Sequence, residues 1–382
     1  MSAKTKHSKP QSKKRPARSN KASVNPLRRI IAIILLVIAI VSSTALVAAS
    51  IAEFISPQLT PLPALLGLTF PIYAIATLLL FIALLIVYPK YALVPLFALL
   101  VAAKGMWQYC PINFDNNSFS TNRDSFTFLS YNTFYFYDTE LEEPTYNRTL
   151  QNIINQNADI VAIQEGAMRF YPGGRHKITH EQLSQIKEQY PYEICENNNR
   201  ILSKYPITTV MDTTYTPTAI TGVYKVEIGN RTVTIINNHL ESIGLTPDDK
   251  QLFTDLTSNP DSIEGRLGEM KLFTKKFLNA FERRAQQVAF VDSIANAIGG
   301  NVIICGDIND TPNSYAYRTL SRNREDAYLN LGTGPGYTYQ ADRMWVRIDY
   351  VLYQGDLEAK YLQRGKILSS DHYPLLVEFG WK

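Results

Sequence analysis

The N-terminal third of the chain contains three apolar segments in close succession. Residues Ile30–Ser50 form a nearly unbroken apolar run, and residues Phe70–Tyr88 form a second run without a charged side chain. Both runs have the length of ~20 residues that an α-helix needs to cross the hydrocarbon core of a bilayer. Residues Tyr91–Trp107 form a third, weaker run, with Lys104 near its end, where a long side chain can reach the interface. The pattern predicts a transmembrane region over residues 30–107.

A cleaved signal peptide is the main alternative for the first run, because Val47-Ala48-Ala49-Ser50 resembles a small-residue cleavage site. The length of the run and the second run that follows it favour membrane helices instead. A buried helix of a soluble core fits less well, since two uncharged segments lie so close together.

After Asp124 the pattern changes to short strands and amphipathic helices. Residues 125–131 alternate between polar and apolar side chains, which predicts a half-buried strand, and residues 159–164 have the composition of a buried strand. Thr179 and Gln182 have the spacing of a capping box, which predicts a helix through Lys187. The pattern also predicts helices at 150–155 and within 245–298, and strands at 223–228, 232–238, 301–305, 347–352 and 375–379.

The order of these elements bears on the fold class. Strands interleaved with few, unevenly spaced helices favour two sheets packed on each other over a regular βαβ winding. We therefore predict that residues 124–382 form one α/β domain with two packed mixed sheets flanked by helices. Residues 108–123 would link this domain to the apolar region.

The positive charge of the chain is concentrated at its N-terminus. The first 29 residues contain ten Lys or Arg and no Asp or Glu, so a chain of net charge +4 leaves −6 for the remainder. A mildly acidic domain does not suit a protein that coats nucleic acid through backbone charge. The three cysteines, Cys110, Cys195 and Cys305, have no metal-site spacing and decide nothing about the compartment.

The basic tail also sets an expected orientation. Lys and Arg flanking a first membrane helix favour a cytoplasmic N-terminus. Three crossings then place everything after Trp107 on the periplasmic or extracellular side, whereas two would leave it in the cytoplasm. We favour three crossings, and therefore an integral membrane protein with its globular domain outside the cytoplasm.

Carboxylate, carboxamide and imidazole side chains recur at the ends of the predicted strands. Any single one has an ordinary explanation as a turn, cap or buried core residue. Eight of them at strand ends are harder to explain in that way, and the Gly306-Asp307-Ile308-Asn309 segment is the clearest case, because strand alternation would put Asp307 and Asn309 on one face. The full set is Asn132, Glu165, His239, Asp307, Asn309, Asp349, Asp371 and His372.

Phosphate-ester hydrolysis gives these residue types a common purpose. Oxygen ligands without cysteine suit a hard cation such as Mg²⁺ or the similar Mn²⁺, with Glu165 as the direct ligand and Asn132 as a neutral helper. Asp307 can orient and deprotonate a water molecule, while Asn309 and His239 donate hydrogen bonds to the phosphate. A His372 kept protonated by Asp349 adds a positive donor.

The ordered set of motifs resembles the endonuclease/exonuclease/phosphatase superfamily, also called deoxyribonuclease-I-like, and specifically a membrane-anchored, bacterial-type member. The resemblance spans residues 124–382 and implies a four-layer α/β sandwich and a divalent-metal phosphodiesterase or phosphatase. It implies the same roles as above, and makes Asp371 an acidic neighbour of the metal or the phosphate. The matching blocks are Ser130-Tyr131-Asn132, Gln164-Glu165, Asn238-His239-Leu240, Gly306-Asp307-Ile308-Asn309, Arg347-Ile348-Asp349-Tyr350 and Ser370-Asp371-His372, with a weaker one at 200–207.

Two features depart from the abasic-site nucleases of that superfamily. Those nucleases carry an acidic residue where this chain has Phe134, and they tend to lack a histidine at the place of His239. The resemblance therefore favours the secreted-nuclease, sphingomyelinase-like and phosphoinositide-phosphatase branches. The segment 243–298 is either a substrate-facing insertion or a packing helix. Its Arg283-Arg284 pair could contact a phosphate, but we expect it to be solvated surface charge.

The function predicted from the sequence is a membrane-anchored, divalent-metal-dependent hydrolase of a phosphodiester or phosphomonoester. Its expected partners are the lipid bilayer and a phosphate-ester substrate, and no protein partner can be inferred. A membrane-tethered nuclease acting on DNA or RNA is the first alternative, and a non-catalytic binding domain on the same fold is the second, because a fold alone does not establish activity.

Overall fold

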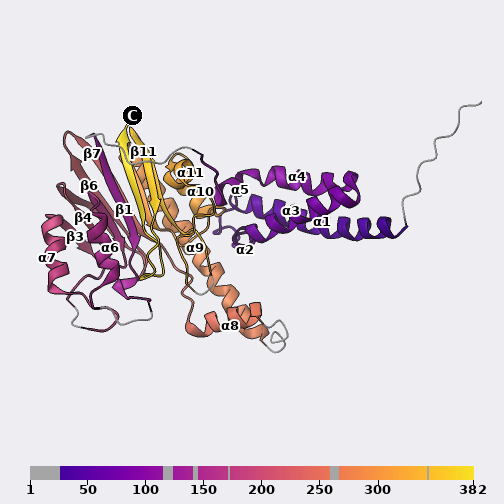
Figure 1. Ribbon diagram of the computed structural model, residues 1–382, viewed down its shortest axis with the longest axis horizontal. Coiled ribbons are helices and arrows are strands. Elements are labelled where there is room, and N and C mark those ends of the chain that lie inside the picture. The colour runs from indigo at the N-terminus through magenta and orange to yellow at the C-terminus, as the bar shows by residue number, and fades with distance from the viewer. Residues whose placement is uncertain (1–25, 115–123, 141–144, 171–172, 259–265, 342–343) are drawn as a thin grey trace, which may run out of the picture.

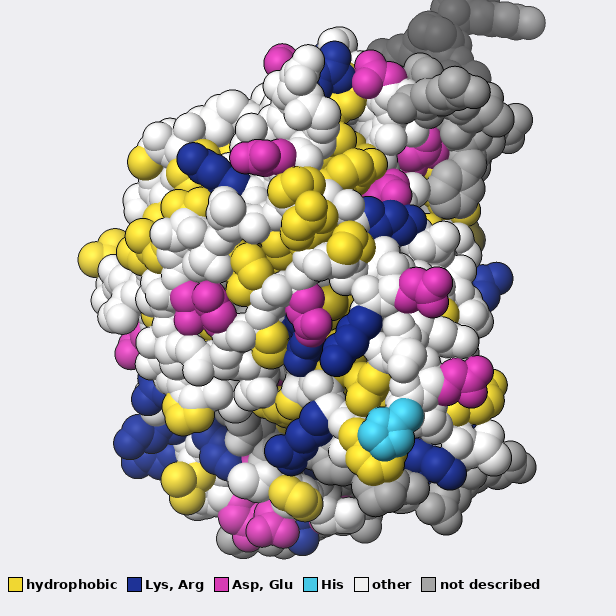
Figure 2. All heavy atoms as spheres, turned by 90° about the vertical axis from the view of Figure 1, so that its left-hand side faces the viewer, with side chains coloured by type: hydrophobic (Ala, Val, Ile, Leu, Met, Phe, Trp, Pro, Cys, Tyr) yellow, Lys and Arg dark blue, Asp and Glu magenta, His cyan; other side chains and the backbone are white. Residues whose placement is uncertain are grey.

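The computed structural model describes residues 26–114, 124–140, 145–170, 173–258, 266–341 and 344–382, so most of the predicted basic tail lies outside the described residues. A helical bundle, residues 26–109, lies at one end of the molecule, and a larger domain of strands and helices, residues 124–382, at the other (Figure 1). We call them the N-terminal bundle and the α/β domain. The end of the α/β domain that faces away from the bundle carries acidic, basic and hydrophobic side chains next to one another (Figure 2).

Two helices of the N-terminal bundle are long and apolar enough to cross a membrane. They are α1 (Pro26–Ala52) and α3 (Phe70–Val87), which correspond to the first two predicted runs. The third run forms α4 (Leu93–Val101) and α5 (Ala103–Tyr109). The helical segment Pro89–Val101 meets α5 at a bend of 58°, and the two together are long and apolar enough for one broken span or a re-entrant loop. The bundle also contains α2 (Leu62–Leu68) and the short 3₁₀ helix η1 (Pro89–Ala92).

The α/β domain contains two mixed six-stranded sheets. The first has the strand order β11-β12-β1-β2-β4-β3 and the second β5-β6-β7-β8-β10-β9. The strands of the first sheet are β1 (Ser125–Asn132), β2 (Ile160–Gln164), β3 (Tyr192–Glu196), β4 (Asn199–Ser203), β11 (Leu357–Arg364) and β12 (Leu375–Trp381). Those of the second are β5 (Ile207–Thr214), β6 (Ile220–Ile228), β7 (Arg231–His239), β8 (Val302–Asp307), β9 (Glu325–Asp326) and β10 (Asp349–Gln354).

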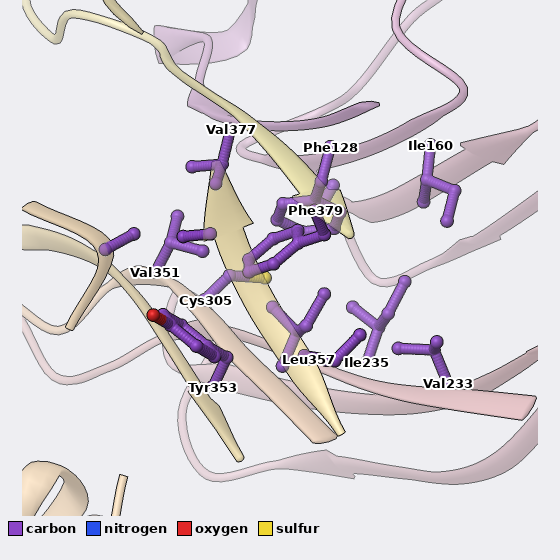
Figure 3. Packing of buried hydrophobic residues seen from close by; sticks show 14 of the residues in the cluster. Phe128, Ile160, Val233, Ile235, Cys305, Val351, Tyr353, Leu357, Val377 and Phe379 are labelled. Carbon is purple, nitrogen blue, oxygen red and sulfur yellow. The ribbon is translucent and has the colours of Figure 1, made fainter. Parts of the chain in front are cut away.

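The two sheets pack face to face through a continuous apolar core. Phe128, Ile160 and Phe379 from the first sheet meet Ile235 and Val351 from the second, and all five are buried (Figure 3). Burying β-branched and aromatic side chains of this size is the main source of stability for such a sandwich.

Helices cover the outer face of each sheet, which completes four layers. Leu150 and Ile153 of α6 (Arg148–Gln156) and Ile186 of α7 (His180–Gln189) pack on the first sheet. The second sheet is covered by α9 (Leu267–Ile298), through residues such as Val288, and by α10 (Tyr315–Ser321). The domain is therefore a four-layer α/β sandwich, as predicted. Its remaining helices are η2 (Phe134–Phe136), α8 (Pro247–Ser258) and α11 (Ala327–Leu331).

Most local predictions agree with the structure. Thr179 and Gln182 form a complete capping box at the start of α7, and the strands predicted at 223–228 and 232–238 pair as the antiparallel β6 and β7. Strands β3, β5, β9 and β11 and helices η2, α10 and α11 were not predicted. The strand expected from Arg347 begins two residues later, at Asp349.

Candidate active site

Three polar side chains form a row across neighbouring strands of the second sheet. Strand β7 ends at His239, β8 ends at Asp307, and β10 begins at Asp349. The parallel β7–β8 pair aligns His239 with Asp307, and the antiparallel β8–β10 pair aligns Asp307 with Asp349. Aligned positions on neighbouring strands share a face of the sheet, so the three side chains project to the same side.

The first sheet supplies two more of the predicted residues. Strands β1 and β2 are parallel and end together, with Asn132 aligned to Gln164. Glu165 follows directly and has a left-handed backbone with φ of 52°. Its carboxylate Oε1 lies 3.5 Å from Asn132 Nδ2 and 3.4 Å from His239 Nε2. Parallel pairing within each sheet thus brings the ends of β1, β2, β7 and β8 together.

Asn132 joins the two sheets at this point. Its Nδ2 donates to Asp307 Oδ2 at 3.1 Å, and both side chains are buried. Its Oδ1 accepts a hydrogen bond from the Phe134 amide at 3.1 Å, so the NH₂ group is the end that faces the carboxylates of Glu165 and Asp307. An assignment of Asn132 as a metal ligand requires the amide oxygen to turn toward Glu165.

His372 completes the cluster from the segment before β12. Its Nδ1 lies 2.8 Å from Asp349 Oδ2, and its Nε2 lies 3.7 Å from Asp307 Oδ2. The ligand atoms of Asp307, Asp349 and His372 all lie within 4.8 Å of one another. The neighbouring Asp371 is placed at the edge of this cluster, where its side chain accepts from Ser370 Oγ at 3.5 Å.

Asn309 lies near the cluster because of the turn after β8, not because side chains alternate along a strand. Strand β8 ends at Asp307, and Asn309 has a left-handed backbone with φ of 56° in the turn that follows. The Asn309 amide donates to Asp307 Oδ1 at 2.8 Å, and its side-chain Nδ2 donates to the Leu240 carbonyl at 2.9 Å. The expectation that strand alternation aligns the two residues was therefore wrong, and an Asx turn holds them together instead.

Gly306 allows β7 and β8 to approach closely beside the cluster. Its φ is 107°, and a Cβ at this position would lie 2.1 Å from the Asn238 carbonyl oxygen. A side chain here would separate the strands that carry His239 and Asp307.

Burial and neighbouring charges determine the protonation states. Burial raises the pKa of Glu165 to about 7, and burial together with the Asp349 charge raises the pKa of Asp307. Burial lowers the pKa of His239 to about 4, so its ring is neutral at pH 7. Burial also opposes protonation of His372, but Asp349 and Asp307 outweigh it and raise the pKa of His372 to about 10. At neutral pH the cluster holds one imidazolium, His372.

The cluster has the properties of a cation site. Three carboxylates, Glu165, Asp307 and Asp349, lie together, and within the described ranges their only contacts with basic side chains are those with neutral His239 and protonated His372. Buried carboxylates that lack a Lys or Arg partner are costly, and a bound divalent cation would offset their charge. The donor set, oxygen and imidazole without thiolate, suits Mg²⁺ or Mn²⁺.

A network of buried amide side chains, which was not predicted from the sequence, lies next to the cluster between the two sheets. Gln164 Nε2 donates to Asn237 Oδ1 at 2.6 Å, and Asn237 Nδ2 donates to the Ile163 carbonyl at 3.1 Å. Asn199 Nδ2 donates to the Asn237 carbonyl at 3.1 Å. All three amide side chains are buried, so they link the two sheets directly behind Asn132 and Glu165. The polar Asn237-Asn238 pair inside a strand was the available signal.

A left-handed turn follows Asn132. Phe134, Tyr135 and Phe136 have φ values of 49°, 52° and 57°. Each non-glycine residue in this conformation costs about 1–2 kcal/mol. Buried Phe136 and a hydrogen bond of 2.8 Å from Asn147 Nδ2 to its carbonyl hold the turn in place. Tyr135 is half-buried, and both burial and the Glu165 charge raise the pKa of its phenol.

The prediction for Arg284 was wrong, whereas that for Arg283 agrees with the structure. Arg283 is largely exposed and pairs with Glu241, but Arg284 is 1% exposed. Its Nε lies 3.2 Å from Asp310 Oδ2, and its guanidinium donates to the Glu241 carbonyl at 2.8 Å. Asp310 follows Asn309, and Glu241 lies two residues after His239. Helix α9 thus packs on the second sheet and also holds the two turns that follow β7 and β8.

The chain is similar to several solved structures. Solved structures similar to the chain include an endonuclease/exonuclease/phosphatase from Beutenbergia cavernae, with 16% identity over 68% of this chain and 72% of that chain and a TM-score of 0.46. Another is an endonuclease/exonuclease/phosphatase from Bacteroides vulgatus, with 14% identity over 68% and 99% and a TM-score of 0.40. A third is the sphingomyelinase C from Streptomyces griseocarneus, with 15% identity over 68% and 99% and a TM-score of 0.39.

No curated protein matches the chain. Residues 30–109 match the model described as Domain of unknown function (DUF8431), which covers most of the N-terminal bundle. Residues 129–372 match the model described as Endonuclease/Exonuclease/phosphatase family. The matched segment is more than half of the chain and contains all eight predicted site residues. The chain therefore belongs to the endonuclease/exonuclease/phosphatase family.

Proposed function

We propose that this chain is a membrane-anchored hydrolase of phosphate esters that uses a divalent cation, Mg²⁺ or Mn²⁺, and an activated water molecule. The observation that carries the proposal is the convergence of Asp307 with residues from both sheets. Asn132 Nδ2 lies 3.1 Å from Asp307 Oδ2, His372 Nε2 lies 3.7 Å away and His239 Nε2 lies 3.9 Å away. Membership of a family that hydrolyses phosphoesters supports the same reaction class.

Glu165 is the residue best suited to hold the cation, with Asn132 and Asp371 as further candidate ligands. Its side chain is 15% exposed, and its carboxylate has only Asn132 and His239 as close polar partners among the described residues. When bound, the cation supplies charge neutralisation at the phosphoryl oxygens, the contribution that metals make in phosphate-ester hydrolysis.

Asp307 is the proposed general base that accepts the proton of the attacking water. The Asn309 amide and Asn132 fix the orientation of its two oxygens. Its pKa is raised above that of an ordinary carboxyl group, which makes Asp307 a stronger base. A general base works best when its pKa lies near the working pH.

Donors to the phosphate come from three side chains. His372 is protonated at neutral pH and is oriented by Asp349, so it presents a positive N–H. His239 is neutral and donates from Nε2 when its proton is on that nitrogen. Asn309 uses one N–H for the Leu240 carbonyl and retains a second for the substrate.

The arrangement of the helix ends in the bundle supports the proposal that the bundle is a membrane anchor and that the candidate active site lies outside the cytoplasm. Arg28 Nε donates to the Val87 carbonyl at 2.8 Å, so the start of α1 and the end of α3 lie at one end of the bundle. Phe70 and Tyr109 stack with ring centroids 5.4 Å apart, so α5 ends near the start of α3, at the other end. A basic, cytoplasmic tail before Arg28 would place the α/β domain on the periplasmic or extracellular side. A C-terminal alkaline phosphatase fusion that is inactive in cells would contradict this orientation.

The activity test uses the full-length chain in detergent micelles or nanodiscs. Wild type should hydrolyse bis-p-nitrophenyl phosphate with added Mg²⁺, lose turnover with EDTA and regain it with excess Mg²⁺. Asp307→Ala should lower turnover by at least ~10²-fold, the usual contribution of general base catalysis. Asp356→Ala, at an exposed carboxylate, is the matched control. Metal-independent turnover, or full activity of Asp307→Ala, would contradict the mechanism.

We favour a lipid or small-molecule phosphate ester over a nucleic acid as the substrate. The chain without its tail carries a net charge of −6, whereas sequence-independent DNA binding relies on positive charge. A panel of phospholipids assayed beside plasmid nicking distinguishes the two classes. Nicking without phospholipid hydrolysis would identify the chain as a membrane-tethered nuclease instead.

A further inference from the structure

The turn that follows the proposed catalytic residues is joined to the N-terminal bundle. Asn313 lies between Asn309 and the start of α10, and its side chain is 1% exposed. Its Nδ2 donates to the carbonyl of Ala49 at 2.8 Å, a buried hydrogen bond between residues 264 positions apart in the chain. Ala49 belongs to the last turn of α1, so Asn313 contacts the end of the first apolar helix.

The backbone of Asn313 also fits closely against α2. A Cβ at Gly67 would lie 3.0 Å from the Asn313 carbonyl oxygen, closer than most real Cβ contacts. Gly67 is buried within α2, and its lack of a side chain allows the turn to approach. The position of the 307–313 turn is thus fixed from the bundle by a hydrogen bond and by close packing.

A second connection reaches the strand that carries Asp349. Arg347, two residues before Asp349, is buried and donates to the Gln108 carbonyl at 2.9 Å. Gln108 lies in the last turn of α5, whose terminal carbonyls lack partners within the helix, and a cation is favourable at a helix C-terminus. Arg347 also pairs with Asp326 at 2.8 Å.

We propose that Asn313 and Arg347 are positioning residues that connect the active site to the ends of α1 and α5. Through them the bundle holds Asp307, Asn309 and Asp349 in the relative positions that the reaction requires. The inference rests on the proposed function, because it assigns the bundle a part in that reaction. Asp307 and Asp349 are aligned partners on β8 and β10, and each is followed or preceded by a residue tied to the bundle. The bundle is then part of the active-site scaffold as well as an anchor.

The test compares three variants of the full-length chain in nanodiscs. Asn313→Ala removes the hydrogen bond to Ala49. Gly67→Ala places a Cβ 3.0 Å from the Asn313 carbonyl oxygen, so the turn must shift, although no residue of the α/β domain is changed. Asn113→Ala is the matched control, because its Nδ2 also ties the connection between the two parts to the α/β domain, but at the carbonyls of Leu329 and Gly332, at α11 and away from the catalytic strands. The measurements are kcat, KM, the unfolding temperature, and amide hydrogen exchange of residues 308–314.

Asn313→Ala and Gly67→Ala should each lower kcat by roughly tenfold to a hundredfold with KM nearly unchanged, since small displacements of catalytic groups have effects of this size. Both should also increase amide exchange in 308–314 while the unfolding temperature stays close to that of Asn113→Ala. Wild-type kcat and exchange in both variants would overturn the inference. If wild type shows no turnover, the proposed function fails, and exchange alone decides: faster exchange in both variants supports the positioning, and unchanged exchange overturns it.

Discussion

His372 and Asp349 form a hydrogen bond between the two sheets, with the imidazole Nδ1 2.8 Å from the carboxylate Oδ2. Asp349 begins β10 of the second sheet, and His372 lies just before β12 of the first. The pair therefore joins the two sheets at the edge that carries the candidate active site. It also sets the charge of the site, because the pKa of His372 is raised to about 10 although burial opposes its protonation.

Asp349→Asn should shift the pH profile of turnover. A histidine is protonated below its pKa, and the variant removes the largest charge that raises the pKa of His372. The alkaline limb of the kcat profile should therefore move to lower pH, and turnover at pH 8 should fall by roughly 10²-fold or more, the usual loss when a donor that stabilises transition-state charge is removed. Profiles of wild type and variant between pH 5 and pH 10 measure this. Coincident alkaline limbs would show that the His372 proton does not limit the reaction.

Binding of Mn²⁺ should weaken as the pH falls through about 7. Burial raises the pKa of Glu165 to about 7, and a carboxyl group is protonated below its pKa, so protons displace the cation at low pH. With that pKa, wild type should bind Mn²⁺ about tenfold more weakly at pH 6 than at pH 8. Calorimetric titration at both pH values measures the ratio.

Glu165→Gln is the control for this titration. It should bind Mn²⁺ at least ~10-fold more weakly than wild type at pH 8 and lose most of the pH dependence, because the titrating ligand is gone. Equal pH dependence in the two proteins would mean that another group binds the proton.

The polar strand ends were predictable because the signal is local. A short β-branched run followed by Asp307 or Glu165 needs no knowledge of distant contacts, and the order of the motifs indicated the family. Strand β11 was missed because Leu357–Arg364 is rich in helix-forming Glu, Lys, Gln and Ala, and only its pairing with β12 makes it a strand.

Contacts between residues far apart in the chain could not be predicted from the sequence. Arg284 resembles a surface arginine until Asp310 is brought against it, and Asn313 resembles an ordinary turn residue until Ala49 is brought beside it. Asn309 shows a related limit: its position beside Asp307 was expected, but it depends on a left-handed turn rather than on strand alternation.

Arg284→Met should destabilise the folded chain far more than Arg283→Met. Removing Arg284 leaves Asp310 buried without its charged partner, which costs about 3–5 kcal/mol. The Arg283 side chain is 58% exposed, and the loss of such a surface pair costs about 0–1 kcal/mol. Unfolding temperatures in nanodiscs compare the two. The double variant Arg284→Met/Asp310→Asn should recover part of the loss, and equal effects of the two single variants would contradict the burial argument.

Tyr135→Gly should lower turnover without lowering stability. Tyr135 is the middle residue of the left-handed turn, where a non-glycine residue costs about 1–2 kcal/mol, and glycine relieves this strain at an entropic cost of about 0.5–1 kcal/mol. Strained backbone persists mainly where a side chain is needed for function, and the Tyr135 phenol is close enough to Glu165 for that charge to raise its pKa, after the larger effect of burial. Asn157→Gly is the control, because Asn157 is also left-handed, with φ of 48°, but ends α6 away from the site. We expect an equal or higher unfolding temperature in Asn157→Gly and a nearly unchanged one in Tyr135→Gly, where the loss of the half-buried ring offsets the relief of strain. We expect reduced kcat/KM only in Tyr135→Gly. Full activity of Tyr135→Gly would mean that the strain serves the path of the chain and not the reaction.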